Sequence, residues 1–136
     1  MLAACAAERE TIPTPPAVPL SVHGAWARAA DSGAMTAVYF TLANGGAAAD
    51  TLMRVQSVDA AAAEMHVSTQ HAGMMHMSPV TALPVPATDS VAFRPLGAHV
   101  MLTGVNRPLT EGDSVTATLT FVSGATLTVR AGVRKP

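Results

Sequence analysis

The sequence predicts an all-β fold in a single domain. Its apolar residues fall into short runs rich in β-branched side chains, and clusters of Gly, Asp, Asn and Ser separate these runs, which is typical of strands joined by turns. The pattern indicates no long amphipathic helix and no internal repeat. With 136 residues, of which 49% are hydrophobic, the chain is long enough to enclose one core and too short for two comfortable ones.

The first 19 residues are expected to form a tether that precedes the folded domain. Four prolines fall within residues 13–19. Because proline lacks the backbone N–H and fixes its own φ angle, this stretch is unsuited to a helix or to strand pairing and favours an extended, partly stiff linker. The folded domain is therefore predicted to span residues 20–136.

Nine extended runs follow the tether, and turns separate them. Asp31-Ser32-Gly33 separates the first two runs, and Asn44-Gly45-Gly46 ends the second. A hairpin-like return through residues 70–73 joins the fourth run to the fifth. Glu111-Gly112-Asp113 precedes the eighth, and Ser123-Gly124 lies between the last two. The predicted strands are residues 20–28, 34–43, 50–58, 62–69, 74–80, 90–94, 99–104, 114–121 and 126–133.

The eighth run shows the clearest strand pattern. From Val115 to Phe121, apolar residues alternate with threonine for most of the run. Successive side chains of a strand point to opposite faces, so this alternation predicts one face on the core and one face toward solvent.

The composition argues against several classes of function. The formal net charge is -1 and the eight basic residues are scattered, whereas proteins that bind nucleic acids gather Lys and Arg on one face. No apolar run approaches the roughly 18 residues that a membrane-spanning helix needs. The sequence has no Gly-x-Ser-x-Gly elbow, Walker loop or Cys-x-x-Cys pair, so we do not expect an enzyme. Asp59 and Glu64 are interpreted as solvated acids, not as a catalytic carboxylate pair.

Methionine and histidine are concentrated in one part of the chain. Residues 65–101 contain five of the eight Met and four of the five His. A single Met is usually core filler and a lone His is usually a satisfied polar residue, but packing gives no reason for the two types to be interleaved. Imidazole and thioether are soft, neutral donors that suit Cu(I), whereas Ca²⁺ and Mg²⁺ prefer oxygen and structural Zn²⁺ usually needs thiolate or more histidines. The cluster therefore predicts a copper site.

Four of these residues have a spacing that allows them to converge. His99 and Met101 are two apart on a predicted strand, so their side chains share a face while Val100 and Leu102 face the core. His66 and Met77 lie on two further predicted strands that the hairpin-like return brings alongside each other. The register of that hairpin is not fixed by the sequence.

These residues carry a resemblance to a known family. The spacing His66-x10-Met77-x21-His99-x-Met101 resembles the signature H-x10-M-x21-H-x-M of the periplasmic Cu(I) chaperones called PCuAC. The resemblance extends over roughly residues 18–133. The flanking segments that agree are Ala25-Trp26-Ala27-Arg28, Ala37-Val38-Tyr39, Leu42-Ala43-Asn44, Met77-Ser78-Pro79-Val80, Pro108-Leu109 and Glu111-Gly112-Asp113.

The resemblance implies a cupredoxin-like Greek-key β-sandwich or barrel that holds Cu(I) through His66, Met77, His99 and Met101. The implied role is to deliver copper in the periplasm or cell envelope to the CuA centre of cytochrome c oxidase, with subunit II or another copper carrier as partner. We expect a monomer. Two alternatives stay open, a copper storage, buffering or resistance protein and a metal-free β-sandwich binding module. A blue-copper electron-transfer site is disfavoured, because it needs a Cys thiolate and the only Cys lies in the tether.

That single cysteine, Cys5, ends a segment that resembles a bacterial lipoprotein signal. In such signals, cleavage leaves the Cys as a lipidated first residue. Only four residues precede Cys5, and they contain no charged start or apolar stretch of roughly 7 to 15 residues. Either the upstream part lies outside this sequence, in which case Cys5 carries a lipid anchor, or the match is an accident of an alanine-rich start.

Other His, Met, acidic and aromatic residues are assigned roles outside the predicted ligand set. We interpret His71, Met74, Met75 and His76 as an exposed connection with incidental donors. The alternatives are that they form a second, looser copper site or that they substitute for the main ligands. Glu64 is interpreted as a plain surface acid in preference to a group that orients His66. Trp26 and Tyr39 are assigned to packing, and His23 to the surface.

Overall fold

The computed structural model describes residues 19–135, and these form ten strands without a helix. No helix in this part of the chain is long and apolar enough to cross a membrane. The all-β prediction is confirmed, while the predicted tether, including Cys5 and except for Pro19, lies outside the described residues. The strands are β1 (Leu20–Arg28), β2 (Thr36–Asn44), β3 (Asp50–Gln56), β4 (Ala60–His71), β5 (Met74–Val80), β6 (Leu83–Val85), β7 (Asp89–Phe93), β8 (Ala98–Val105), β9 (Ser114–Phe121) and β10 (Thr126–Arg134).

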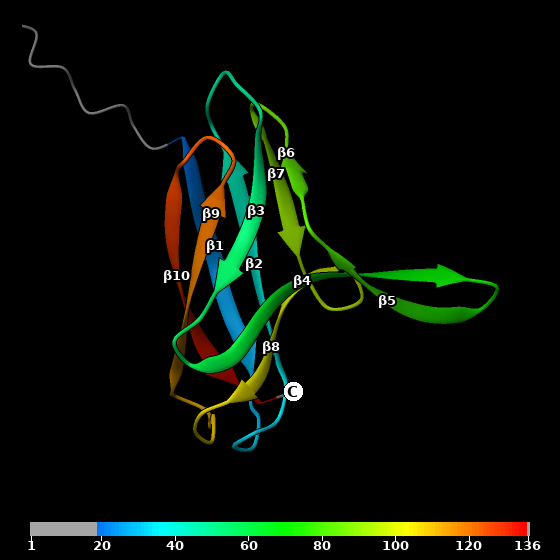
Figure 1. Cartoon of the computed structure of the whole chain (residues 1–136), viewed down its shortest axis with the longest axis vertical. Helices are drawn as coiled ribbons and strands as arrows, with labels where there is room; N and C mark the ends of the chain where they lie inside the picture. The colour runs from blue at the N-terminus through cyan, green and yellow to red at the C-terminus, as the bar shows by residue number, and fades with distance from the viewer. Residues whose placement is uncertain (1–18, 136) are drawn as a thin grey trace, which may run out of the picture.

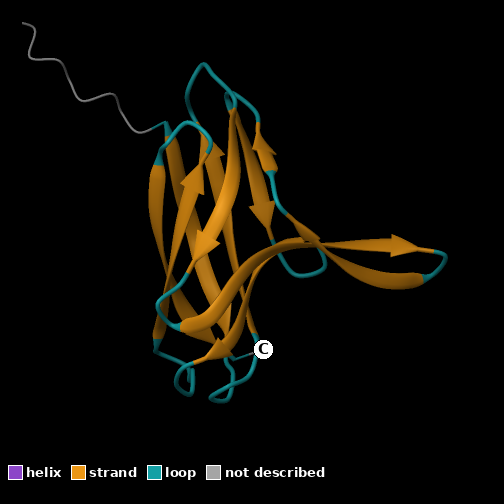
Figure 2. Ribbon diagram, in the orientation of Figure 1, coloured by secondary structure: helices purple, strands orange, loops and turns teal. Residues whose placement is uncertain are grey.

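All ten strands belong to one sheet. Its order is β5-β4-β8-β7-β2-β1-β10-β9-β3-β6, and β8 also pairs with β2. Figure 2 shows the strands wrapping around a common interior. The chain crosses between distant strands, so that β8 lies between β4 and β2, as expected for Greek-key connections. This crossing brings the two halves of the predicted copper motif onto neighbouring strands.

The core is built from the inward faces of these strands. On β9, Val115, Ala117, Leu119 and Phe121 are at most 2% exposed, and the residues between them are half-buried, which confirms the alternation. On β8, Val100 and Leu102 are fully buried. The side chains of His99 and Met101 consequently lie on the opposite face of β8.

The observed strands differ from the prediction most at two places, while β2, β3, β7, β8 and β10 differ from it by one or two residues at their ends. Short β6 was not predicted, because it has three residues and Pro84 in its centre. Proline is tolerated there because β6 is the last strand of the sheet order, where one side needs no partner. β4 is longer than predicted at both ends. Its alanine-rich start at Ala60 has low β propensity and is held by pairing with Val105 of β8. Its last two residues, Gln70 and His71, were expected to belong to the hairpin return but pair with β5.

The β4–β5 hairpin projects from the body of the domain, as Figure 1 shows. Pairing between β4 and β8 ends where Val67 meets Ala98, and the rest of β4 pairs with β5 alone. Ala72 and Gly73 have φ values of 52° and 79°, which is the backbone of a tight two-residue hairpin turn. Every residue of β5 except Val80 is exposed, because no second layer covers the hairpin.

Asp59 fastens the loop between β3 and β4 to β9 and to the connection that follows β8. Its carboxylate accepts hydrogen bonds from the Thr116 amide at 2.7 Å and from the Arg107 guanidinium at 2.5 Å. Its side chain is 13% exposed. Burial acts to raise the pKa of Asp59, but the Thr116 amide and the Arg107 charge outweigh it and hold the pKa below its ordinary value.

We predict that Asp59→Asn destabilises the fold by about 1 to 3 kcal/mol at pH 7, because hydrogen bonds to a charged acceptor are lost. The folded-state pKa is lowered, so the contribution of Asp59 is complete above the unfolded-state pKa of about 3.9 and is lost as the pH falls from there through the folded-state value. Urea denaturation at pH 7 and pH 3 should show a smaller pH dependence in Asp59→Asn than in the wild type. The exposed Asp31→Asn serves as control, and an equal pH dependence in Asp59→Asn and wild type would contradict the prediction.

Candidate metal centre

Two of the predicted ligands face each other across neighbouring strands. His66 on β4 is the direct partner of His99 on β8, and their ring centroids are 5.7 Å apart. A metal bound at about 2 Å from a ring nitrogen lies roughly 3 Å from the ring centroid, so two imidazoles on one ion are at most about 6 Å apart. The observed separation lies within that span.

The register places the two thioethers on the same face as the imidazoles. Met101 lies opposite Glu64, which is two residues from His66 on β4. Met77 lies opposite Ser68, two residues from His66 in the other direction. Because residues two apart on a strand share a face, all four predicted ligands point to one side of the sheet.

A pocket of about 360 Å³ opens on this face. Three of the four predicted ligands line it, Met77, His99 and Met101, and so do the additional thioethers of Met35 and Met75. His66 does not line the pocket, but its ring lies next to that of His99, which does. Three of the four predicted ligands, from β5 and β8, therefore line one pocket, and the fourth lies on β4 directly beside His99.

His99 is held in a form that is suited to binding a metal. The side chain is 4% exposed, and its Nδ1 lies 3.1 Å from the Gly97 carbonyl oxygen. If Nδ1–H donates to that carbonyl, Nε2 keeps a free lone pair. Burial is the main cause that lowers the pKa of His99, and the nearby His66 and Arg28 act in the same direction while the Gly97 hydrogen bond opposes them. The neutral, ligating form is therefore favoured at neutral pH.

His66 is oriented by a carboxylate. Its Nε2 lies 2.9 Å from Oε2 of Glu64, so Glu64 is not the plain surface acid that the sequence favoured. The other ring nitrogen, Nδ1, is buried and has no hydrogen-bond partner among the described residues. A carboxylate on one nitrogen and an unused lone pair on the other is the arrangement common for metal-bound histidines.

Aromatic residues cover the site on the side of β1 and β2. The Tyr39 ring centroid is 6.4 Å from that of His99 and 4.7 Å from that of Trp26. The guanidinium of Arg28 lies 5.6 Å from the Tyr39 centroid. Trp26 and Tyr39 thus have the packing role expected for them, and they bury one flank of His99.

The sequence pointed to some neighbouring residues correctly and missed others. Met35 was missed, because it lies 30 residues before the His and Met cluster and only the pairing of β2 with β8 brings it to the pocket. Asp59 is not the solvated acid that the sequence favoured, because its side chain is 13% exposed and contacts Arg107; that contact also means that it forms no carboxylate pair with Glu64. Residues 19–135 contain no group of three or more His, Cys, Asp or Glu side chains placed to hold a metal. A metal at this site would therefore depend on the thioethers.

The sequence is similar to those of proteins named as lipoproteins. Residues 20–133 match the family model described as "Putative lipoprotein LpqE-like". The chain is 30% identical over 116 residues to "Putative lipoprotein Lxx21020" of Leifsonia xyli subsp. xyli, which corresponds to 85% of this chain and 69% of the relative.

Two solved structures show the same architecture. The solution structure of CuI-DR1885 from Deinococcus radiodurans is 33% identical, with a TM-score of 0.65, and the match covers 87% of this chain and 81% of the other. The copper-bound PCuAC domain from PmoF2 is 24% identical, with a TM-score of 0.71, and covers 87% of this chain and 94% of the other. The predicted cupredoxin-like fold class is confirmed.

Proposed function

The chain belongs to the LpqE-like family of PCuAC-type domains, and from that premise we propose that it is an extracytoplasmic carrier of Cu(I). Copper is its cargo, and His66, Met77, His99 and Met101 are its ligands. Residues 20–136 form the copper-binding domain and residues 1–19 its tether. The protein has no catalytic role in this proposal.

One observation carries the proposal, the convergence of two imidazoles and two thioethers on one face of the sheet. His66 and His99 are direct cross-strand partners, and Met77 and Met101 line the adjoining pocket. Such neutral, soft ligands prefer Cu(I) over harder cations and leave the ion with its own positive charge. The CuI-bound relative from Deinococcus radiodurans, 33% identical, supports the same cargo.

The ligand types also fit a compartment outside the cytoplasm. In an oxidising environment thiols are consumed by disulfide formation, whereas a thioether cannot form a disulfide and releases no proton when it binds a metal. The only Cys is Cys5, which precedes the domain. The lipoprotein names of the family and of the Leifsonia relative support a location in the cell envelope, with Cys5 as the lipid attachment site.

The recipient in this proposal is the CuA centre of cytochrome c oxidase, and a storage protein of the same chemistry is the second candidate. A carrier must release copper to its recipient, whereas a store need not. The test is to mix the Cu(I)-loaded protein anaerobically with the apo soluble domain of oxidase subunit II and to follow the copper content of each after separation. Transfer supports delivery, and retention of copper by the loaded protein supports storage. Failure of the protein to bind Cu(I) at all would favour the metal-free module.

We predict that Glu64→Gln lowers the Cu(I) affinity about tenfold. Loss of a carboxylate that orients a ligating histidine typically costs about 10- to 100-fold, and the 62% exposure of the Glu64 side chain places the effect at the low end. Competition with a chromophoric Cu(I) chelator under anaerobic conditions measures the change. Glu111→Gln, an exposed acid outside the pocket, is the matched control, and equal affinities in the two variants would show that Glu64 does not support the site.

A further inference from the structure

The β4–β5 hairpin carries a second set of soft donors on the face that points away from the pocket. His71 is the direct cross-strand partner of Met74, and His76 lies opposite Thr69, two residues from His71. Side chains of a strand alternate between faces, so His71, Met74 and His76 share one face. Met75 and Met77 share the other face and line the pocket already described.

These three donors are arranged like His66, His99 and Met101, three of the four ligands proposed for the first copper site. There, His66 pairs directly with His99, and Met101 follows two residues later on the strand of His99. On the hairpin, His71 pairs directly with Met74, and His76 follows two residues later on the strand of Met74. A direct pair has Cβ atoms about 5 Å apart, and the diagonal neighbour lies about 7 to 8 Å away. Both triangles therefore have the same backbone dimensions.

The tight turn holds the hairpin triangle in register. His71 and Met74 flank the two turn residues Ala72 and Gly73, whose positive φ angles define a two-residue connection. A one-residue slip would move the donors to opposite faces, and this turn disfavours such a slip. The donor positions are thus fixed by the backbone although the face is open to solvent.

Nothing else among the described residues engages these side chains. His71 and His76 are exposed, and neither takes part in a hydrogen bond or ion pair between described residues. The side chain of Met74 is exposed, with 63% of the residue accessible, and this exposure of an apolar group has no packing benefit. Residues 65–80 include no Asp, Glu, Lys or Arg, so the hairpin offers a metal neutral nitrogen and sulfur together with neutral oxygen.

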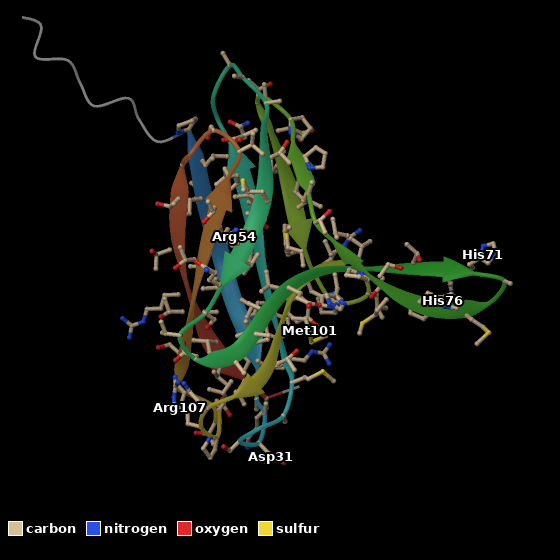
Figure 3. All side chains as sticks on the ribbon, in the orientation of Figure 1. Asp31, Arg54, His71, His76, Met101 and Arg107 are labelled. Atoms are coloured by element: carbon tan, nitrogen blue, oxygen red, sulfur yellow. The ribbon has the colours of Figure 1, made fainter. Side chains whose placement is uncertain are left out.

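We propose that His71, Met74 and His76 bind a second Cu(I), independently of the pocket. Figure 3 shows His71 and His76 on the projecting part of the hairpin, away from Met101. The ion there is open to solvent and to a colliding partner, whereas His99 in the pocket is buried. The second site is accordingly the weaker and faster-exchanging of the two, and the protein binds two Cu(I) ions.

The test follows the methionine methyl groups by NMR in protein labelled with ¹³C at the methionine methyl carbons. Cu(I) is added anaerobically, and Ag(I) is added as a second monovalent probe. The first equivalent should shift the methyl signals of Met77 and Met101, and the second should shift that of Met74. Met53, which is 44% exposed on β3, is the internal control and should not move. A Met74 signal that is unchanged through two equivalents would overturn the proposal.

Two double variants separate this site from the pocket. His71→Ala with His76→Ala should lower the stoichiometry from two Cu(I) ions to one and leave the shifts of Met77 and Met101 intact. His66→Ala with His99→Ala should retain the Met74 shift. If Met74 responds while Met77 and Met101 do not respond in the wild type, the pocket ligands are wrong and the hairpin site stands. If the variant His71→Ala with His76→Ala keeps two ions, the hairpin site is wrong.

Discussion

Replacing His66 or His99 with alanine is expected to lower the Cu(I) affinity of the pocket by about 100-fold or more. Loss of a group that only supports a ligand costs about 10- to 100-fold, so loss of the ligand itself should reach the upper end of that range. The two imidazoles are direct cross-strand partners with ring centroids 5.7 Å apart, and each has a hydrogen-bond partner that orients one nitrogen.

The measurement is anaerobic competition with a chromophoric Cu(I) chelator, and His23→Ala is the matched control. His23 is an exposed histidine on β1 that contacts Ser21. It should leave the affinity unchanged. Because His99 is buried, its removal leaves a cavity, and the thermal unfolding of each variant must be recorded beside its affinity. Wild-type affinity in a folded His66→Ala or His99→Ala protein would remove that histidine from the ligand set.

Much of the fold could be predicted because most strands have a residue pattern that is typical of a strand without reference to their partners. β9 alternates apolar and threonine residues, and β5 begins and ends at the predicted residues. β6 could not be predicted, since a three-residue strand with Pro84 is identified only by the partner it meets on β3. The alanine-rich start of β4 likewise becomes a strand through its partner on β8.

The site was predictable where its residues are close in the sequence or have a known spacing. His99 and Met101 share a face of any strand, and the spacing of the other two resembled a family signature. The contact of Glu64 with His66 depends on side-chain orientation, and the position of Met35 depends on β2 lying beside β8. Neither is encoded in local periodicity. The assignment of the four ligands stays a prediction, which the variants of His66 and His99 test.

Met101 and Leu102 are adjacent on β8 but should have different roles, one in binding copper and one in stabilising the core. Replacing Leu102 is expected to have the second large effect, on the free energy of unfolding. Leu102 is fully buried in the core, so Leu102→Ala should reduce the free energy of unfolding by about 2 to 5 kcal/mol. That is a large part of the roughly 5 to 15 kcal/mol available to a small domain. Met101 lies on the pocket face and is half-buried, so the shape-conserving Met101→Leu should cost less than about 1.5 kcal/mol while it removes a thioether ligand.

Urea denaturation of the apo and Cu(I)-loaded forms distinguishes the two roles in one experiment. A ligand that binds only the folded state stabilises it in proportion to the logarithm of its concentration over its dissociation constant. Leu102→Ala should start from a lower apo stability and gain as much from Cu(I) as the wild type does, because its pocket is intact. Met101→Leu should start near wild-type stability and gain less. If Met101→Leu gained as much as the wild type, the thioether at position 101 would not bind copper. If Leu102→Ala gained less than the wild type, the core and the pocket would not be the separate faces of β8 that the strand geometry requires.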